Sequence, residues 1–279
     1  MTALNDAAQD RYIVPALANG LAILRLFSKN RLTWTPPDIA RELSLPRATV
    51  FRLLQTLEVG GYVRRDGGGR SFTLGPALLN HGFAYLASLD IVDAARPILK
   101  RLRDETGLSA HLAVRDGREV VYVARVASHG AVASGVHVGT RFPIHATILG
   151  RSLISDMSAT ELERLYPETS LPSFSDQTPK TRESLGRLLA QDRARGYSVS
   201  QSFFELGVSA IAAPVRDQSN QVVAAINIIA ADACITAETL NGQLKDQVLK
   251  AAAELTSWVG ATHQFSRANR RPELHGPAS

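Results

Sequence analysis

The sequence predicts an α+β protein made of a small N-terminal domain and a larger C-terminal one. Its 279 residues are 45% hydrophobic and 20% charged, which is typical of a globular chain, and a length of roughly 150 residues per domain predicts two domains. Helical periodicity dominates residues 16–59, whereas the apolar runs VVYVARV (120–126) and VVAAINII (222–229) show no alternation. Strands of that kind are usually covered on both faces, which predicts a sheet between helices.

The composition excludes several classes of protein. No apolar run approaches the roughly 20 residues that a membrane-spanning helix needs, and the polar, acidic residues 1–10 do not resemble a signal peptide. The single cysteine, Cys234, excludes an internal disulfide and a cysteine-rich zinc site, so we expect a cytoplasmic protein with no membrane partner. Residues 1–75 carry ten Lys and Arg against six Asp and Glu, or +4 of the total charge of +5. This basic domain indicates a polyanionic partner, although a solvated basic face would have the same composition.

Three helices are expected in the N-terminal domain. The first spans residues 16–27, with four large apolar side chains at helical spacing, Leu17, Leu21, Leu24 and Phe27. An extended piece at 32–35 supplies Trp34 as a core anchor, and Pro36-Pro37 then opens a second helix. The third helix covers residues 46–59 and carries a narrow apolar stripe formed by Val50, Leu53, Leu54 and Leu57.

A β-hairpin is expected to follow the third helix. Two short alternating runs flank the turn Asp66-Gly67-Gly68-Gly69, and three arginines lie at or near its tip. Helix, short strand, helix, tight turn, helix and hairpin together constitute a winged helix-turn-helix.

The C-terminal domain is expected to alternate strands and helices after a connector helix at 76–88. Asp116-Gly117 predicts a tight hairpin turn, and Gly196 predicts the end of a helix. We expect helices at 91–105, 146–157, 159–165, 181–195 and 237–259, and strands at 109–115, 119–126, 131–138, 197–201, 211–215 and 222–229.

Across residues 13–260 the chain resembles the IclR family of bacterial transcriptional regulators. The segments that carry the resemblance, in this order and spacing, are ALANGLAILRLF (16–27), DIARELSLPRATVFRLLQTL (38–57), GYVRRD (61–66), EVVYVARV (119–126), VGTRFPIHATILGRSL (138–153), RGYSVS (195–200) and GVSAIAAPVRD (207–217). The resemblance implies a DNA-binding winged helix, a linker helix, and a GAF-like effector-binding domain with helices on both faces of an antiparallel sheet. It also implies a dimer or a pair of dimers and no cofactor.

The expected organisation is a flexible start at 1–12, the winged helix at 13–75, the linker at 76–90, the effector-binding domain at 91–262 and a flexible tail at 263–279. Double-stranded operator DNA, pseudo-palindromic for a dimer, is the expected partner of the winged helix.

Arginines on the third helix can donate two hydrogen bonds to guanine, Gln55 can pair with adenine, and Ala48 and Phe51 suit thymine methyls. Thr35 is placed to cap the second helix, whose N-terminus could face a phosphate, and the wing arginines should touch phosphates or enter a minor groove. The complete expected DNA-binding set is Thr35, Arg47, Ala48, Thr49, Phe51, Arg52, Gln55, Arg64, Arg65 and Arg70.

The pocket positions that the resemblance implies are Ile148, Leu149, Ser200, Ala210, Asn227 and Ile229, with Ala131, Ser134, Phe142, Phe203 and Phe204 as further walls. Relatives that bind small 2-oxo acids tend to place an acidic residue at 200, a cysteine at 210, a serine at 229 and small residues at 148 and 149. The larger apolar residues here predict a drier pocket, suited to an acid with an apolar body such as a hydroxybenzoate. The AAIN segment at 224–227 is similar to that of hydroxybenzoate-sensing members. A 2-oxo acid such as glyoxylate or pyruvate remains the alternative, and Phe203 and Phe204 could be plain core.

No catalytic or metal-binding pattern accompanies these features. His111, His129, His137 and His145 lack the spacing of metal ligands and are interpreted as core or surface histidines. Gly67-Gly68-Gly69 lacks the Lys-Ser/Thr of a phosphate loop, and GVSAI (207–211) has isoleucine where a nucleophile elbow needs glycine. An enzyme acting on a small acid is therefore the less favoured class.

Overall fold

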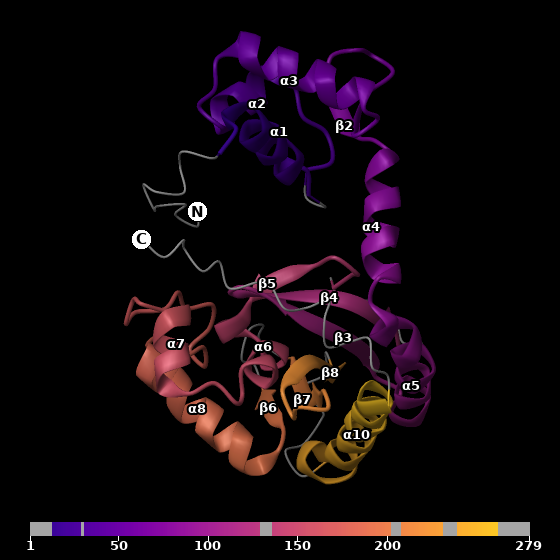
Figure 1. Cartoon of the computed structure of the whole chain (residues 1–279), viewed down its shortest axis with the longest axis vertical. Helices are drawn as coiled ribbons and strands as arrows, with labels where there is room; N and C mark the ends of the chain where they lie inside the picture. Colours follow the sequence, from indigo (N-terminus) through magenta and orange to yellow (C-terminus); the bar gives the residue numbers. More distant parts are fainter. Residues whose placement is uncertain (1–12, 29–30, 129–135, 202–207, 231–238, 262–279) are drawn as a thin grey trace, which may run out of the picture. The chain divides into compact units, whose positions relative to one another are not determined.

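The computed structural model describes residues 13–28, 31–128, 136–201, 208–230 and 239–261, apart from the side chains of 200, 201, 230 and 241. The chain divides into two compact units, residues 1–85 and 86–279, drawn in Figure 1. The flexible start and the flexible tail that the sequence predicts lie outside the described residues. No helix in the described segments is long and apolar enough to cross a membrane.

The N-terminal unit forms the expected order of helices and hairpin. Its elements are α1 (Pro15–Leu26), α2 (Pro36–Glu42), α3 (Arg47–Val59), β1 (Val63–Arg65), β2 (Phe72–Leu74) and α4 (Ala77–Ala87). Ile23, Ile39, Val50 and Leu54 are fully buried and pack with Trp34 and Phe72 in one core. The predicted anchor Trp34 also bridges its backbone to Phe72 of the hairpin, so the wing is held to the helices by both core packing and main-chain hydrogen bonds.

The apolar side chains of α1 differ from the sequence expectation. Leu17 and Leu21 are 62% and 47% exposed, whereas Gly20 and Ile23 face the core. Leu17 and Leu21 thus lie off the buried face, whereas Leu24 and Phe27 of the predicted set pack against the core. A helix with apolar residues on more than one side does not reveal by periodicity alone which side the domain covers.

The hairpin and the start of α4 meet at two glycines. Gly75 donates its N–H to Tyr62 O (2.7 Å), and Ala77 donates to Gly61 O (3.2 Å). A Cβ added at Gly75 would lie 2.1 Å from Gly61 O, so only glycine permits this approach of the two backbone segments. The contact fixes how α4 leaves the wing.

The C-terminal unit is built on a six-stranded antiparallel sheet. In sequence order its elements are α5 (Asp90–Thr106), β3 (Ser109–Asp116), β4 (Glu119–Val126), β5 (Arg141–Pro143), η2 (Ile144–Ala146), α6 (Ile148–Leu153), α7 (Ala159–Leu165), α8 (Arg182–Arg195), β6 (Ser198–Gln201), β7 (Ser209–Arg216), β8 (Val222–Ala230), η3 (Leu240–Leu244) and α10 (Lys245–Ala261). The strand order is β5-β4-β3-β8-β7-β6, which pairs β3 with β8 across more than 100 residues of sequence. The fold is the predicted α+β arrangement.

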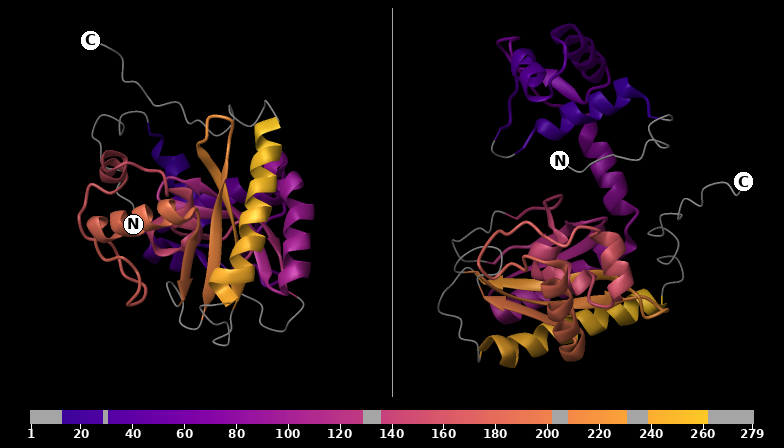
Figure 2. Two further views of the ribbon diagram at one scale, coloured as in Figure 1. Left: turned by 90° about the horizontal axis from the view of Figure 1, so that it is seen from below. Right: turned by 90° about the vertical axis from the view of Figure 1, so that its left-hand side faces the viewer.

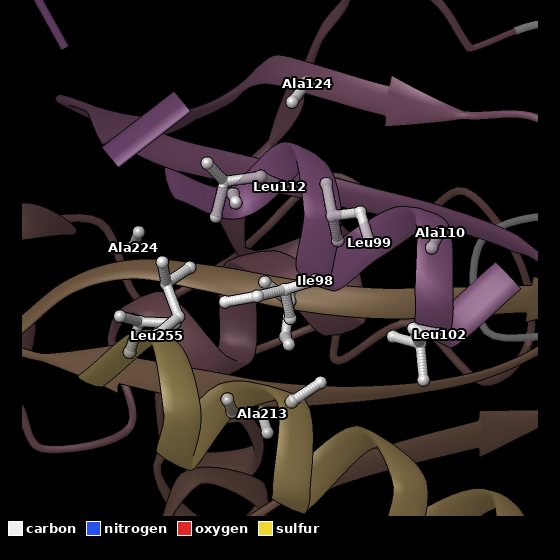
Figure 3. Packing of buried hydrophobic residues seen from close by; sticks show 14 of the residues in the cluster. Ile98, Leu99, Leu102, Ala110, Leu112, Ala124, Ala213, Ala224 and Leu255 are labelled. Carbon is white, nitrogen blue, oxygen red and sulfur yellow. The ribbon is translucent and has the colours of Figure 1, made fainter. Parts of the chain in front are cut away.

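Helices cover both faces of this sheet. On one face α5 and α10 lie side by side, as the left view of Figure 2 shows. Their apolar side chains, including Leu99 and Leu255, meet inward residues of β3, β7 and β8 such as Leu112, as the close view in Figure 3 shows. The other face packs against α6, and α7 and α8 extend its core. This second core contains five of the candidate pocket residues.

Two expected elements of the C-terminal unit are wrong in detail. Residues 136–138 of the strand expected at 131–138 form an irregular segment and a turn, and the edge strand is β5, at 141–143. The single helix expected at 237–259 is broken at Gly242, whose φ and ψ of −96° and −117° are not helical. In both places apolar residues continue through the irregular segment, so hydrophobic pattern alone did not show the break.

Candidate functional site

The outer face of α3 presents side chains to solvent because the inner face is committed to the core. Val50 and Leu54 are fully buried, while Arg47, Ala48, Phe51 and Arg52 are exposed. Phe51 is 53% exposed, so a large aromatic side chain lies among the polar residues of this helix face. Within the described residues, the guanidinium groups of Arg47 and Arg52 have no hydrogen-bond or ion-pair partner. This group is called the α3 outer face below.

The next turn of α3 is already tied to the wing. Gln55 Nε2 donates to Glu58 Oε2 (3.3 Å), and Arg65 Nε donates to both oxygens of Glu58 (3.0 and 3.2 Å). The Arg65 guanidinium also lies 5.0 Å from the ring centroid of Phe72. Sequence reasoning missed Glu58, whose charge holds Arg65 in place. Gln55 and Thr49 are half-buried, so both present less surface than the four exposed residues do.

The remaining wing residues lie on a well-defined hairpin. Arg64 Nε donates to Thr73 Oγ1 across the strands (3.2 Å), whereas the guanidinium of the exposed Arg70 has no polar partner among the described residues. Asp66 closes the turn by accepting from the hydroxyl and backbone N–H of Ser71. These hydrogen bonds hold the pKa of the Asp66 carboxyl below its ordinary value. The hairpin tip is thus ordered by its own contacts.

Thr35 caps α2 as predicted, but the cap leaves no donor for a phosphate. The N–H of Asp38 donates to Thr35 Oγ1 (3.3 Å) and the N–H of Ile39 to Thr35 O (3.1 Å). Pro36 and Pro37 have no N–H to offer. The hydroxyl of Thr35 and the charges of Arg41 and Arg31 also lower the pKa of the Asp38 carboxyl, so an anion already lies at this terminus. The expectation that the α2 N-terminus faces a phosphate is therefore not supported.

The sheet brings most of the described candidate pocket residues together. Ala210 pairs with Ile229, and Asn227 pairs with Ala212 on one side and His111 on the other. Five of the predicted residues pack on one side of the sheet in the core formed with α6, namely Phe142, Ile148, Leu149, Ala210 and Ile229. Ser200 pairs with Ala210 through its backbone, and its side chain lies outside the described part. Ala131, Ser134, Phe203 and Phe204 also lie outside it.

Sequence reasoning missed three residues of this same face, His111, Tyr122 and Arg125. His111 is fully buried, and its Nδ1–H donates to Asn227 Oδ1 (3.0 Å). The Tyr122 ring stands edge-on to both His111 and Phe142, with centroid distances of 5.5 and 5.9 Å. Arg125 lies opposite His111 in the β3–β4 register. The sequence analysis interpreted His111 as a core or surface histidine and gave it no part in the pocket. In the described segments no three His, Cys, Asp or Glu side chains gather to hold a metal.

A buried ion pair joins α6 to α8 beside this face. Arg151 and Asp192 are 2% and 1% exposed, and two hydrogen bonds of 2.7 Å connect them. Asp192 also accepts from Ser198 Oγ (2.8 Å) and from Arg195 (2.6 Å). Each charge of this pair is thus met by an opposite one, as a buried pair requires.

Comparison with known proteins identifies both units. Residues 16–67 match the model of the IclR helix-turn-helix domain, and residues 83–257 match that of the bacterial transcriptional regulator IclR C-terminal region. These two matches cover α1 to the hairpin turn and nearly the whole six-stranded sheet with its helices. The fold and the family models therefore agree along the chain.

Individual relatives match most of the chain. The chain is 32% identical over 247 residues to the Pca regulon regulatory protein of Pseudomonas putida, covering 88% of this chain and 84% of the relative. It is 33% identical to a transcriptional regulator of known structure from Rhodococcus sp. RHA1, with a TM-score of 0.77 and coverage of 88% and 98%. A second similar structure, 25% identical with a TM-score of 0.75 over 90% of this chain and 99% of its own, is an IclR homologue from Microbacterium hydrocarbonoxydans complexed with 4-hydroxybenzoate. The chain belongs to the IclR family of bacterial transcriptional regulators, with a DNA-binding winged helix-turn-helix and an effector-binding C-terminal domain.

Proposed function

We propose that this regulator reads its operator with the α3 outer face and that a small aromatic acid of the hydroxybenzoate type controls the binding. The observation that carries the first part is the exposure of Arg47, Phe51 and Arg52 on one side of a helix whose opposite side is core. Two unpaired guanidinium groups can each donate two hydrogen bonds to a guanine edge in the major groove. Arg64, Arg65 and Arg70 on the wing then supply phosphate or minor-groove contacts.

The aromatic acid is supported by the residues that the fold brings together and by one relative. Ile148, Leu149 and Ile229 present apolar side chains where a short polar 2-oxo acid would need donors. The Microbacterium homologue was solved with 4-hydroxybenzoate. Glyoxylate and pyruvate are the competing effectors.

Self-association is the third part of the proposal. In the described residues of the isolated chain, α4 buries none of its side chains, and Leu79 and Phe83 are 60% and 66% exposed. Leu17 and Leu21 of α1, with Val14 just before the helix, are further exposed apolar side chains. A second copy of the chain is the occupant we propose, because two winged helices would read a pseudo-palindromic operator. Replacing Leu79 and Phe83 by glutamate should lower the mass measured by sedimentation equilibrium, whereas an unchanged mass would remove α4 from the interface.

DNA reading is tested with duplexes selected from a random library by the full-length protein. Arg52→Ala should weaken binding to the selected duplex by about 1–3 kcal/mol, roughly 5- to 150-fold, and leave a scrambled duplex nearly unaffected. Arg187→Ala, an exposed arginine on α8, is the matched control and should change neither. Arg65→Ala should weaken binding to every duplex and reduce the salt slope by about one counterion. Equal losses of Arg52→Ala on both duplexes would refute its base-reading role.

Effector control is tested in two steps. A thermal-shift screen of hydroxybenzoates, 2-oxo acids and acyl derivatives should show stabilisation by hydroxybenzoates, because a ligand that binds only the folded state raises its melting temperature. The binding acid should then change affinity for the selected duplex by about 1–3 kcal/mol through the 76–90 linker. Identical duplex affinity with and without the bound acid would exclude this coupling.

A further inference from the structure

Two buried nitrogen atoms on the α6 side of the sheet lack a hydrogen-bond partner. They are Nε2 of His111 and Nε of Arg125, and neither finds an acceptor or donor within the described residues. Buried polar atoms are nearly always hydrogen-bonded, so two unmet atoms on neighbouring strands need an explanation. The buried Arg151 on the same side of the sheet is, by contrast, paired with Asp192.

The sheet register places the two atoms beside each other. His111 of β3 lies opposite Arg125 of β4 and also opposite Asn227 of β8. Side chains of register partners project from the same face of a sheet, with Cβ atoms about 4.5–5.5 Å apart. Asn227 is one of the positions that the resemblance to the IclR family assigns to the pocket. His111 and Arg125 therefore lie on the face that carries the proposed effector site.

The hydrogen bond to Asn227 determines which nitrogen of His111 carries a proton. An amide oxygen only accepts, so Nδ1 donates to Asn227 Oδ1. Burial, together with a smaller effect of the Arg125 charge, lowers the pKa of His111 to about 4 although the hydrogen bond to Asn227 raises it, so the imidazole is neutral in ordinary buffers. A neutral imidazole has a single N–H, which leaves Nε2 as a hydrogen-bond acceptor.

Arg125 offers the complementary group. Its Nε–H is an unused donor on a positively charged, half-buried side chain, and its Nη1 lies 3.5 Å from His137 Nδ1. No carboxylate in the described part of the chain pairs with it. The other described groups that face His111 are the neutral Tyr122 ring and the Asn227 amide. The described part of the site therefore has a cation and an acceptor side by side and no anion.

We propose that His111 and Arg125 form the polar end of the effector site and select an acid that also carries a hydroxyl group. The hydroxyl donates to His111 Nε2, and the carboxylate accepts from Arg125 Nε–H. A 2-oxo acid has no hydroxyl hydrogen to donate to His111 Nε2, so the lone pairs of Nε2 and of the keto oxygen would face each other. Sites that hydrogen-bond a hydroxyl group discriminate strongly against analogues that lack it. The proposal rests on the proposed effector function and goes beyond it by naming the two residues and the chemical class that they select.

The experiment compares acids that differ only at the hydroxyl, using calorimetric titration of the full-length protein. The pairs are 2-, 3- and 4-hydroxybenzoate against benzoate, and lactate against pyruvate. The wild type should prefer the hydroxylated member of at least one pair by tenfold or more. His111→Phe should abolish that preference while affinity for the hydroxyl-free acid stays within about twofold. Arg125→Met should weaken both members at least tenfold, with partial recovery in Arg125→Lys, and Arg115→Met on β3 is the matched arginine control.

A second measurement does not depend on the folding of any variant. In wild-type protein labelled with 15N-histidine, the bare Nε2 of His111 should shift when hydroxybenzoate binds and stay in place when benzoate binds. The inference would be overturned if these acids bound the wild type but their affinity depended neither on the hydroxyl group nor on His111→Phe or Arg125→Met. The proposed function would then still stand. If none of these acids binds the wild type, the proposed effector class itself fails.

Discussion

The α3 outer face and the sheet face around His111 both contain polar groups without protein partners, but in opposite surroundings. Arg47 and Arg52 extend into water, which hydrates a guanidinium at no cost to stability. His111 Nε2 and Arg125 Nε are shielded from water, and each buried unmet group costs about 1–3 kcal/mol. An unpaired arginine on the surface is therefore weak evidence for a ligand, whereas unpaired groups in the interior are strong evidence. The DNA-reading assignment therefore needs the family match beside the exposed helix face, whereas the His111 assignment rests on geometry.

The largest expected effect tests whether this fold penalises an unpaired buried charge. Asp192→Asn leaves Arg151, which is 2% exposed, without its main counter-charge. Breaking a buried pair in this way costs about 3–5 kcal/mol. Urea unfolding of the C-terminal unit should show that loss when followed by Trp258 fluorescence in a Trp34→Phe background, because the chain has one tryptophan in each unit.

The matched control for Asp192→Asn is Glu183→Gln. Glu183 pairs with Arg187 on the same helix α8, but the two side chains are 80% and 65% exposed. Removing an exposed pair changes stability by no more than about 0.5 kcal/mol. If the two substitutions lowered the free energy of unfolding equally, burial would not set the cost of an unpaired charge in this protein. The contrast between the α3 outer face and the sheet face around His111 would then lose its basis.

The next largest effect concerns the protonation of His111. Its pKa is about 4 in the folded protein against an ordinary value of 6.5, because burial disfavours the charged imidazole. Below pH 6.5 the unfolded chain takes up a proton that the folded chain does not, so the stabilisation is complete above pH 6.5 and is lost as the pH falls toward 4. The difference between the two values corresponds to roughly 3 kcal/mol.

This pH effect is measured by comparing unfolding free energies at pH 7.5 and pH 4.5 in the wild type and in His111→Gln. Between these two pH values the wild type should lose more free energy of unfolding than His111→Gln, and the difference should approach the roughly 3 kcal/mol given above. His145, whose pKa is also lowered by burial, is present in both proteins and cancels in the comparison. Parallel pH profiles would mean that His111 is not neutral in the folded state, and its Nε2 would then be a donor.

The two faces also differ in how far the sequence predicted them. The α3 outer face follows from one helix and its 3.6-residue period, so Arg47, Phe51 and Arg52 were found correctly as exposed residues. The Thr35 cap and the helix end at Gly196 were likewise predictable, because each depends on a few neighbouring residues. Local pattern was sufficient wherever the structure is local.

The sheet face depends on pairings that no local pattern contains. His111 meets Asn227 because β3 and β8 are neighbours across 116 residues of sequence. Arg125 reaches the same side only because a bulge between Leu112 and Ala113 shifts the β3–β4 register. An alternation count through that bulge would assign Arg125 to the wrong face. The resemblance to the IclR family identified Asn227 as a pocket position. Its polar neighbours His111 and Arg125 could be identified only from the strand pairing in the structure.

The smallest expected effect is on the α3 outer face itself. Arg47→Ala and Arg52→Ala should each change the free energy of unfolding of the N-terminal unit by less than about 0.5 kcal/mol, because neither side chain has a partner to lose among the described residues. Arg65→Ala is the informative neighbour, since it removes the contacts to Glu58 and Phe72 and should cost up to about 1 kcal/mol. Trp34 fluorescence during urea unfolding reports all three variants. A loss well above 0.5 kcal/mol for Arg52→Ala would show that this arginine supports the fold, and its effect on DNA binding could then no longer be attributed to base contacts alone.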